Sequence, residues 1–516
     1  MDALENTRIQ EREEKIEVGA LLTSIFIIAV CGLVYELIIG SLSSYLLGDS
    51  VYQFSITIGF FLTAMGLGSF LSRVVTKNLL RIFLFVEIAI GLIGGFSAAG
   101  LFAAYTVFER SYSVIMIATI VALGALIGLE IPLLTRIAKR YGSLRDTLAN
   151  VLAFDYLGAL AASLLFPLVL LPYLGLSKTS FMVGMFNLLV VAINLRVFAK
   201  GLTQTRLISV ATLGVVALLA GGFVQSAAIT ALFEHRLYQD QIIYAEQSRY
   251  QRIIVTRYQD DVRLFLDNEL QFSSRDEYRY HESLVHPAMS LAPSRENVLV
   301  IGGGDGLVMR EVLKYADVRR ATLVDIDPAM THLGQTFGPI VALNRNSLND
   351  ARVSIVNADG YRFLADSSDL YQVIIADLPD PRNETLARLY SRDFYGLVKR
   401  HLARGGIFVT QASSPYFVRT AYWCIAHTAA DAGLNVQTYH VYVPSFGYWG
   451  FVLASDLDVH WSDIQLRAPT RYLSSEMLSA MTAFDADASE VPTEISTLEN
   501  PAVWRYYLDG WRRWRG

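Results

Sequence analysis

Aspartate residues follow several short apolar segments in the second half of this 516-residue chain. They stand at or just after the ends of ATLVDID, VSIVNADG and YQVIIAD, and they are Asp325, Asp327, Asp359, Asp377 and Asp380. Carboxylates are costly to gather in one place unless positive charge balances them. If these side chains meet in one crevice, they indicate a cationic ligand.

A glycine-rich turn, GGGDG, follows another apolar segment, NVLVIG. The glycines that would let the backbone approach a ligand closely are Gly302, Gly303, Gly304 and Gly306. Tight packing explains many such turns, so the turn alone is weak support for a site. Asp305 adds a carboxylate to it, and Asp325 could accept hydrogen bonds from both hydroxyls of a ribose.

The elements that must position these residues alternate in type from residue 297 onward. Apolar strands are separated by helical segments such as LVMREVLKY, and GGIFVTQ is predicted as a fifth strand. This alternation is typical of a parallel, doubly wound sheet whose ligand site lies at the carboxyl ends of the strands. Residues 250–272 contain short alternating runs, which predict a small antiparallel sheet.

The first half of the chain differs in composition. The whole chain is 53% hydrophobic and 18% charged, against about 25% charged residues in soluble domains. Seven apolar stretches suit membrane-spanning helices of ~20 residues. They run roughly 18–41, 51–72, 82–108, 112–135, 151–172, 178–195 and 207–230. We therefore expect a multi-pass protein of the cell membrane, with the lipid bilayer as a partner.

Lysine and arginine gather before the first stretch and after the second, fourth and sixth. The positive-inside rule then places the N-terminus in the cytoplasm. Seven crossings would put the second half of the chain outside the cytoplasm. Either one stretch is re-entrant or that half lies on the far side, and both alternatives stay open.

Four acidic residues lie within the apolar stretches, namely Glu36, Glu87, Glu130 and Asp155. Carboxylates at membrane depth usually face a bundle interior or a polar cavity. They suit a path or site for a cation, such as a proton or a protonated amine. Local hydrogen bonding to tyrosine or to the backbone is the alternative that we favour.

Other ligand classes have no support in the sequence. The net charge of −5 gives no reason to expect a nucleic acid. No histidine pairs with cysteine or carboxylate at the spacing of a metal site. We predict no metal, no nucleic-acid partner and no tightly bound cofactor.

Residues 248–456 resemble the spermidine synthases, which are polyamine aminopropyltransferases. The matching segments follow the family's order; they are SRYQRIIV (248–255), LFLDNELQFSSRDEYRYHE (264–282), VLVIGGGDG (298–306), LVDID (323–327), NADG (357–360) and ADLPDP (376–381). The combination of DEYRYHE with GGGDG is specific, because methyltransferases of the same fold lack it. The apolar half resembles the multi-pass extension of membrane-bound members.

The expected architecture is a multi-helix transmembrane domain followed by an α/β Rossmann-like domain of the doubly wound, methyltransferase type. A small antiparallel β subdomain stands on the N-terminal side of that domain. The expected parts are a transmembrane domain of about seven helices (1–233), the β subdomain (234–290), the aminopropyltransferase domain (291–456) and a C-terminal helical tail (457–516). The tail suits a membrane interface or packing on its own domain equally well. We also expect a homodimer.

The resemblance implies a role for each candidate residue. Decarboxylated S-adenosylmethionine, the expected co-substrate, would be held by Gln251, Gly302, Gly304, Asp325, Asp359 and Gly360. The residues expected at the small-molecule polyamine substrate or the aminopropyl arm are Tyr280, His281, Asp305, Asp380 and Gln411. Asp377 would be catalytic together with Tyr280, and Asp380 would bind the far ammonium of putrescine.

The chemistry suits these residue types. A primary amine with a pKa of ~10 must lose a proton before it attacks the aminopropyl carbon of the sulfonium donor. Asp377 can take that proton, and Asp380 can orient the diamine through a charge-assisted hydrogen bond. The products would be spermidine and 5′-methylthioadenosine. Because this leaving group is a neutral thioether, the reaction requires neither a metal nor a covalent enzyme intermediate.

Three positions depart from the family pattern. Asp325 replaces the usual glutamate, Arg382 and Asn383 replace a glycine–proline pair expected near the adenine, and Phe446 replaces a tyrosine expected near the amine. The acceptor could therefore differ from putrescine.

Two other functions stay open. One is a membrane polyamine transporter or sensor with a non-catalytic binding domain, and the presence of both Asp377 and Asp380 argues against it. The other is an S-adenosylmethionine-dependent methyltransferase, against which the segment DEYRYHE argues.

Overall fold

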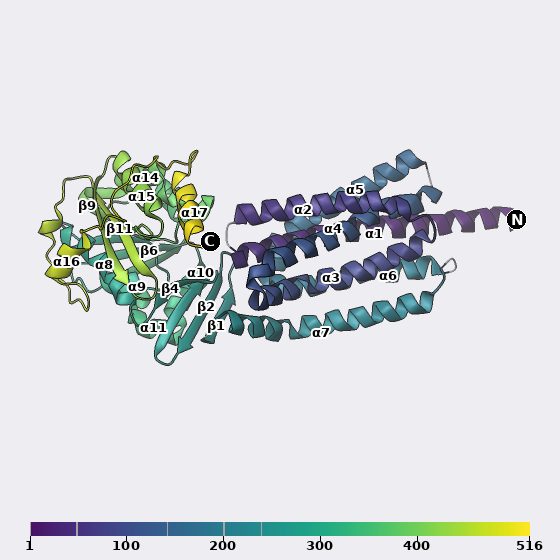
Figure 1. Ribbon diagram of the computed structural model, residues 1–516, viewed down its shortest axis with the longest axis horizontal. Coiled ribbons are helices and arrows are strands. Elements are labelled where there is room, and N and C mark those ends of the chain that lie inside the picture. The colour runs from purple at the N-terminus through teal and green to yellow at the C-terminus, as the bar shows by residue number, and fades with distance from the viewer. Residues whose placement is uncertain (1, 48–49, 142, 200–201, 239, 516) are drawn as a thin grey trace. The chain divides into compact units, whose positions relative to one another are not determined.

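The computed structural model describes residues 2–47, 50–141, 143–199, 202–238 and 240–515. The chain divides into two compact units, Met1–Gln239 and Asp240–Gly516 (Figure 1). The sequence placed this boundary at 233/234, but the last helix of the first unit continues to Leu237.

Long helices make up the described part of the first unit. They are α1 (Asp2–Leu47), α2 (Ser50–Leu71), α3 (Leu79–Val107), α4 (Tyr112–Ala138), α5 (Leu144–Leu165), α6 (Leu171–Val197) and α7 (Thr205–Leu237). A π-helical turn, Phe166–Leu170, joins α5 to α6, and Gly175 interrupts helical geometry with a φ of 70°. The seven apolar stretches are thus helical, as predicted.

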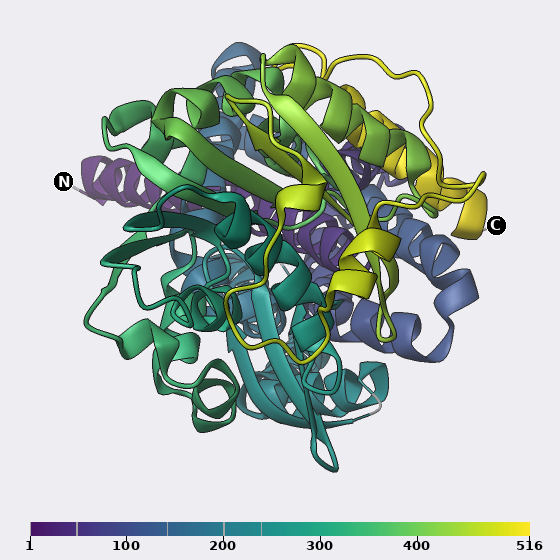
Figure 2. The same cartoon turned by 90° about the vertical axis from the view of Figure 1, so that its left-hand side faces the viewer.

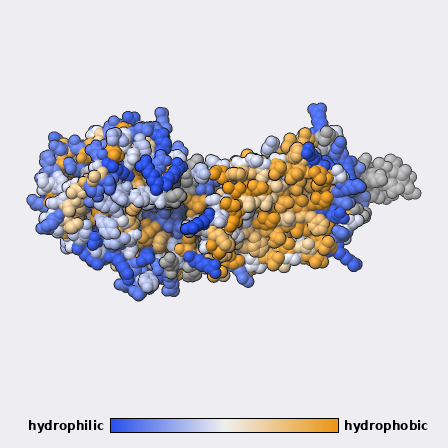
Figure 3. All heavy atoms as spheres, in the orientation of Figure 1, coloured by the Kyte–Doolittle hydropathy of each residue, from blue (hydrophilic) through white to orange (hydrophobic). Residues whose placement is uncertain are grey.

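Six segments are long and apolar enough to cross a membrane by length and composition. They are Arg12–Leu47, Tyr52–Val74, Leu79–Val107, Tyr112–Tyr141, Arg145–Val197 and Thr205–Phe233. The fifth has 53 residues. A straight helix of that length would measure ~80 Å, whereas the hydrocarbon core of a bilayer is ~30 Å thick. This segment contains the kink at Gly175 and covers two of the predicted stretches. Hydrophobic residues dominate the face of this unit shown in Figure 3.

Glycine allows α2 and α4 to pack closely. A Cβ atom on Gly68 would overlap the carbonyl oxygen of Ala125, and one on Gly128 would overlap that of Met65. Gly66, by contrast, faces open space. Small residues therefore set the separation of these two helices, as is common where helices pack without large side chains between them.

Two of the predicted intramembrane carboxylates are fully buried in the first unit. Glu87 is 0% exposed and accepts a hydrogen bond of 2.6 Å from Asn187 Nδ2, a side chain of another helix rather than the tyrosine or backbone partner that we expected. Glu130 is 1% exposed, and within the described residues neither of its carboxylate oxygens has a hydrogen-bond donor.

A four-stranded antiparallel sheet opens the second unit. Its strands, in spatial order, are β1 (Gln241–Gln247), β2 (Arg252–Tyr258), β3 (Asp261–Leu266) and β4 (Glu269–Ser273). The last three confirm the prediction from residues 250–272. This sheet packs on α9 (Leu307–Val312), α10 (Pro328–Thr336) and α11 (Gly338–Asn344) through a small apolar core.

The larger sheet has seven strands in the order β10-β11-β9-β8-β5-β6-β7. The five predicted strands are present and parallel; they are β5 (Asn297–Gly302), β6 (Arg320–Asp325), β7 (Val353–Asn357), β8 (Tyr371–Asp377) and β9 (Leu402–Gln411). Two further strands that we did not predict add an antiparallel edge to the sheet. β10 (Asn435–Val443) and β11 (Gly447–Ser455) form a hairpin, and β11 pairs antiparallel with β9.

Helices cover both faces of this sheet (Figure 2). Leu299 and Ile301 face a core shared with α12 (Gly360–Asp366), α13 (Glu384–Ala387), α14 (Arg392–His401), α15 (Arg419–Asp431) and α17 (Ala502–Arg515). Val298 and Val300 face the opposite core, shared with α8 (Glu277–Leu291), α9 and α16 (Ser475–Met481). Because successive side chains of a strand point to opposite faces, the apolar run of β5 serves both cores.

Candidate active site

The predicted aspartates converge at the carboxyl ends of the central strands. Gly302 stands in register with Asp377 across β5 and β8, and Asp325 closes the neighbouring strand β6. The chain runs from β5 outward to β7 and then returns to β8 on the other side of β5. Doubly wound sheets bind ligands where the strand order reverses in this way.

The glycine-rich turn fits closely between the two acidic strand ends. Gly302 has a φ of +80°, and a Cβ atom there would overlap the carbonyl oxygen of Asp377. A Cβ atom on Gly304 would lie 2.6 Å from Asp325 Oδ2. These glycines therefore serve the packing of the turn against the site acids. Gly360, also predicted to contact the nucleoside, is needed because a Cβ atom there would meet Ile301.

Asp377 forms the centre of the site with Tyr280 from α8. The Tyr280 hydroxyl donates a hydrogen bond of 2.6 Å to Asp377 Oδ1. Burial raises the pKa of Asp377, while the charge of His281 and the Tyr280 hydrogen bond oppose that rise. A carboxylate whose pKa moves toward neutrality is a better general base at pH 7. The structure thus places Tyr280 and Asp377, the two residues predicted to be catalytic, in direct contact.

His281 is oriented by a residue that sequence reasoning missed. Its Nδ1–H donates to Glu277 Oε2 at 2.8 Å, and Glu277 is itself paired with Arg310. Burial lowers the pKa of His281, but the hydrogen bond and charge of Glu277 outweigh it, so the pKa is raised overall. The spacing of four residues within DEYRYHE was the available signal, since such residues share one face of a helix.

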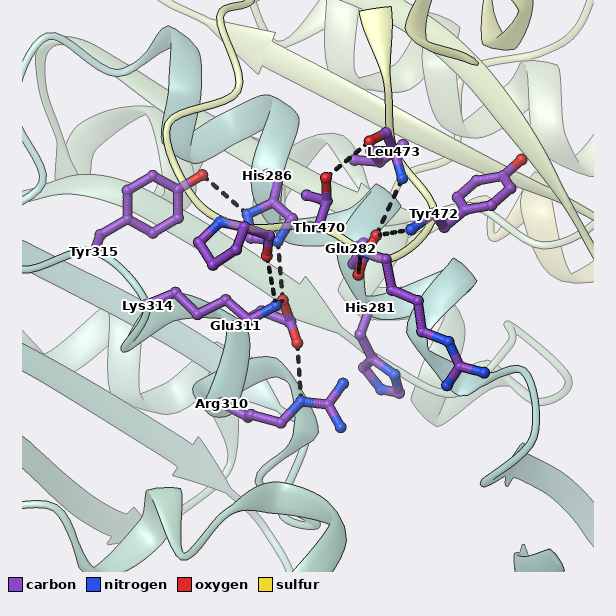
Figure 4. A network of polar contacts seen from close by, with 12 residues as sticks. His281, Glu282, His286, Arg310, Glu311, Lys314, Tyr315, Thr470, Tyr472 and Leu473 are labelled. Carbon is purple, nitrogen blue, oxygen red and sulfur yellow. Dashed lines mark hydrogen bonds and ion pairs between the residues drawn. The ribbon is translucent and has the colours of Figure 1, made fainter.

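A buried polar network lies behind His281 (Figure 4). Arg310 Nε donates to Glu311 Oε1 at 2.8 Å, and Glu311 Oε2 contacts His286 Nε2 at 2.9 Å. Burial opposes ionisation of Glu311, but His286 and Lys314 stabilise the carboxylate, and its pKa falls to about 2. This network fixes Arg310, and through Glu277 it fixes His281.

Asp305 lies in the turn after β5 and is 8% exposed. Its Oδ1 accepts a hydrogen bond of 2.8 Å from the Leu307 backbone N–H. Burial raises the pKa of Asp305 to about 6; the charge of Asp377 adds to the rise, and that of His281 opposes it. Asp305 therefore belongs to the same electrostatic cluster as Asp377 and His281.

The nucleoside end of the site is built around Asp325. Its Oδ1 and Oδ2 accept hydrogen bonds from the backbone N–H groups of Asp327 and Gly304, at 2.8 and 3.0 Å. These contacts fix the orientation of the carboxylate, and burial raises its pKa to about 6. Gln251 donates from Nε2 to Asp327 Oδ2 at 3.0 Å, so it lies beside this end of the site.

Asp359 borders a cavity of ≈740 Å³ whose lining includes Tyr250, Ile326, Ala358, Phe363 and Arg388. Its Oδ1 caps α12 by accepting a 3.0 Å hydrogen bond from the Arg362 N–H, and its Oδ2 pairs with Arg388. The carboxylate thus has structural partners at the edge of a cavity that both apolar and charged side chains line.

The opposite end of the site contains Asp380. Ser413 Oγ donates to its Oδ2 at 3.1 Å, and Gln411 Nε2 lies 3.4 Å from its Oδ1. Burial and the charge of Glu269 raise the pKa of Asp380 to about 6. Gln411, which we predicted for the polyamine pocket, lies next to Asp380, and Ser413 is an additional neighbour that sequence reasoning missed. Its position two residues beyond the end of β9, next to β8, was the signal that could have identified it.

Two of the three departures from the family pattern change contacts around the site. Arg382 pairs with Asp267 Oδ2 at 3.2 Å and Glu269 Oε2 at 2.7 Å, and Asn383 caps α13. Both residues therefore stabilise the loop after β8. Phe446 packs its ring 6.0 Å from that of Tyr280 and brings no hydroxyl.

Comparisons with known proteins agree with this geometry. The spermine/spermidine synthase domain matches residues 277–462. A polyamine aminopropyltransferase of Leptospira interrogans is 43% identical over 494 residues, which cover 96% of this chain and 99% of that protein. Polyamine aminopropyltransferase 2 of Ralstonia nicotianae is 44% identical over 498 residues, which cover 95% of this chain and 98% of that protein.

A crystal structure of spermidine synthase in complex with the transition state analogue AdoDATO is 26% identical, with a TM-score of 0.45. It covers 48% of this chain and 86% of that chain. The two relatives match this chain over nearly their whole lengths. The predicted family is therefore confirmed: the chain belongs to the polyamine aminopropyltransferases.

Proposed function

We propose that this transferase moves the aminopropyl group of decarboxylated S-adenosylmethionine to a diamine such as putrescine, and that its helical unit holds it in a membrane. The observation that carries the proposal is the pair of carboxylates at the end of β8. Asp377 is hydrogen-bonded to Tyr280, and Asp380, three residues later, is held by Ser413 and Gln411. One carboxylate serves each end of a short diamine.

The reaction needs a proton acceptor and nothing covalent from the protein. The amine nitrogen forms a bond to the aminopropyl carbon next to the sulfonium sulfur, and the carbon–sulfur bond breaks with its electron pair going to sulfur. The leaving group is the neutral thioether 5′-methylthioadenosine. The attacking nitrogen releases one proton, which Asp377 takes. The raised pKa of Asp377 suits this step.

The donor would lie across the carboxyl ends of β5 and β6. Asp325, oriented by two backbone N–H groups, accepts hydrogen bonds from the ribose hydroxyls. The base occupies the cavity bounded by Ile326 and Ala358. Asp305 faces the ammonium of the aminopropyl arm from the same electrostatic cluster as Asp377.

Six apolar helical segments support the membrane part of the proposal. A reporter domain fused to the C-terminus tests the side on which the second unit lies. Signal from the cytoplasmic side alone supports one re-entrant segment, whereas signal from the far side alone supports seven crossings.

Release of methylthioadenosine tests the catalytic part. The purified full chain is incubated with decarboxylated S-adenosylmethionine and putrescine, and wild-type protein should release the thioether. Asp377→Asn should lower kcat by about 10²- to 10⁴-fold, the range for loss of general base catalysis. Asp458→Asn, at an exposed position, is the matched control and should match wild type. No release by wild type, or equal release by Asp377→Asn, contradicts the proposal.

A further inference from the structure

Asp276 stands at the N-terminal end of α8, yet its side chain does not cap that helix. A carboxylate at this position usually accepts a hydrogen bond from a backbone N–H of the first turn. Here both oxygens contact Ser445 instead, 169 positions away. Oδ2 accepts from the Ser445 backbone N–H at 2.6 Å, and Oδ1 accepts from its hydroxyl at 2.9 Å. Asp276 is 6% exposed, so this buried carboxylate serves a tertiary contact rather than a helix end.

Ser445 belongs to the tight turn that joins β10 to β11. The backbone N–H of Phe446 donates to the Val443 carbonyl at 3.1 Å and closes this turn. Gly447 follows with a φ of +89°, a conformation that glycine adopts at little cost. Because Asp276 holds Ser445 at two atoms of so short a turn, the direction of the next side chain, Phe446, is fixed as well.

Phe446 links this turn to the active site. Its ring centroid lies 6.0 Å from that of Tyr280, with the rings at 68° to each other, and 5.0 Å from that of Trp449. The ring of Phe451, in β11, lies 5.4 Å from the same tyrosine. The hairpin therefore packs on the Tyr280 ring from both its turn and its second strand. The hydroxyl of that ring donates the 2.6 Å hydrogen bond to Asp377.

The spacing of the two residues in α8 makes this arrangement possible. Asp276 and Tyr280 are four residues apart, so they lie on the same face of the helix, one turn from each other. The hairpin that Asp276 binds is thus the hairpin that packs on Tyr280. A change at Asp276 can alter the position of the tyrosine without removing any group that contacts Asp377.

We propose that Asp276 is a positioning residue for the reaction. By fixing the turn between β10 and β11, it keeps Phe446 against the Tyr280 ring and so keeps the Tyr280 hydroxyl directed at Asp377. This inference rests on the proposed function. It adds a second group to the catalytic pair, one that takes no proton and acts through the hairpin.

Two variants loosen the turn from opposite sides. Asp276→Asn removes the charge that both Ser445 donors share and replaces one acceptor oxygen by an NH₂ group. Ser445→Ala removes the hydroxyl contact and keeps the backbone N–H, so the test does not depend on the folding of the first variant. Asp456→Asn is the matched control. Asp456 Oδ1 accepts a 2.9 Å hydrogen bond from the Gly405 N–H just beyond the other end of β11, at the sheet edge opposite the site.

Methylthioadenosine release by the full chain is measured from about pH 5 to about pH 9 with saturating donor and putrescine. A poorly directed Tyr280 hydroxyl stabilises the Asp377 carboxylate less, so the acid limb of kcat should move to higher pH in Asp276→Asn and in Ser445→Ala. On that limb kcat should fall about two- to tenfold, the lower part of the range for residues coupled by contact, while the plateau stays at the wild-type value. Asp456→Asn should match wild type at every pH.

The decisive comparison is made in Tyr280→Phe, which lacks the hydroxyl that Asp276 is inferred to direct. The double variant Asp276→Asn/Tyr280→Phe should have the same acid limb as Tyr280→Phe alone. His281 and Asp305, whose charges also act within this cluster, are unchanged in every variant.

Three results would overturn the inference alone. The first is an acid limb at the wild-type position in both Asp276→Asn and Ser445→Ala. The second is a shift from Asp276→Asn that is undiminished in the Tyr280→Phe background. The third is a rate lowered by one constant factor at every pH, which is the effect of a damaged fold. If wild-type protein releases no methylthioadenosine, the proposed function fails and this inference falls with it.

Discussion

Replacing Tyr280 by phenylalanine tests how the protein sets the basicity of Asp377. The change removes the hydroxyl that donates the 2.6 Å hydrogen bond to Asp377 Oδ1. The ring keeps its packing, with its centroid 5.4 Å from that of Phe451 and 5.1 Å from that of His281. The variant therefore isolates one hydrogen bond from the rest of the site.

The size of the effect follows from three influences on one carboxylate. Burial raises the pKa of Asp377, whereas the charge of His281 and the Tyr280 hydrogen bond lower it. A hydrogen bond to a charged group contributes about 1.5–3 kcal/mol, and one pKa unit corresponds to about 1.4 kcal/mol. Losing the hydroxyl should therefore raise the pKa of Asp377 by about 1–2 units.

The sign of the pH effect follows directly. Asp377 acts as a base only when it is ionised, and a higher pKa means that it ionises at higher pH. The acid limb of kcat against pH should therefore move upward by about 1–2 units in Tyr280→Phe, while the plateau above it stays near the wild-type value.

The assay is methylthioadenosine release at saturating donor and diamine, from about pH 5 to about pH 9, the range in which such limbs are resolved. Tyr422→Phe is the control, since its buried hydroxyl contacts the backbone carbonyls of Tyr439 and Phe451 at 3.2 Å each. An acid limb that coincides with that of wild type would refute the reasoning. A rate reduced by one constant factor at every pH would do the same.

Two further predictions concern other parts of the chain. Burial holds the pKa of Asp380 and of Asp305 at about 6 each, so both lose their charge as the pH falls through that value. Below about pH 6, kcat/KM for the diamine should decline as Asp380 is protonated, and kcat/KM for the donor should decline as Asp305 is protonated; profiles that are flat to about pH 5 would contradict this. In the helical unit, Gly128→Ala should lower stability by about 1–3 kcal/mol, because overpacking a tight helix contact costs that much and the new Cβ would overlap the Met65 carbonyl. Thermal unfolding in detergent measures this, with Gly66→Ala, which faces open space, as the control; equal melting temperatures would count against the packing argument.

The central strands could be predicted because each is a continuous apolar run with its own boundary residues. The run NVLVIG forms β5, and its alternate side chains pack into two separate hydrophobic cores. The hairpin of β10 and β11 could not be predicted in the same way. Its place depends on pairing between Phe451 and Gln411, residues far apart in sequence, and no local pattern specifies that pairing.

The acids of the site were predictable for a geometrical reason. Strands of one parallel sheet end on one edge, so Asp325 and Asp377 had to approach each other once the strands were recognised. The positions of the hydroxyl and amide groups around these acids could not be predicted from the strand ends. Ser413 reaches Asp380 through tertiary packing, and Asp359 proved to cap a helix and pair with Arg388 as well as to border a cavity.

The distribution of positive charge around the site explains why so many carboxylates can coexist there. Three arginines around the site are already paired with acids; Arg310 pairs with Glu277, Arg382 with Asp267 and Glu269, and Arg388 with Asp359. Among the described residues, no arginine forms an ion pair with Asp305 or Asp380, and burial raises the pKa of each to about 6. An ammonium or sulfonium group beside a carboxylate favours its ionised form. We therefore expect the substrates to balance the charge of these inner acids, and we expect the neutral thioether product, which carries no such charge, to bind less strongly than the donor.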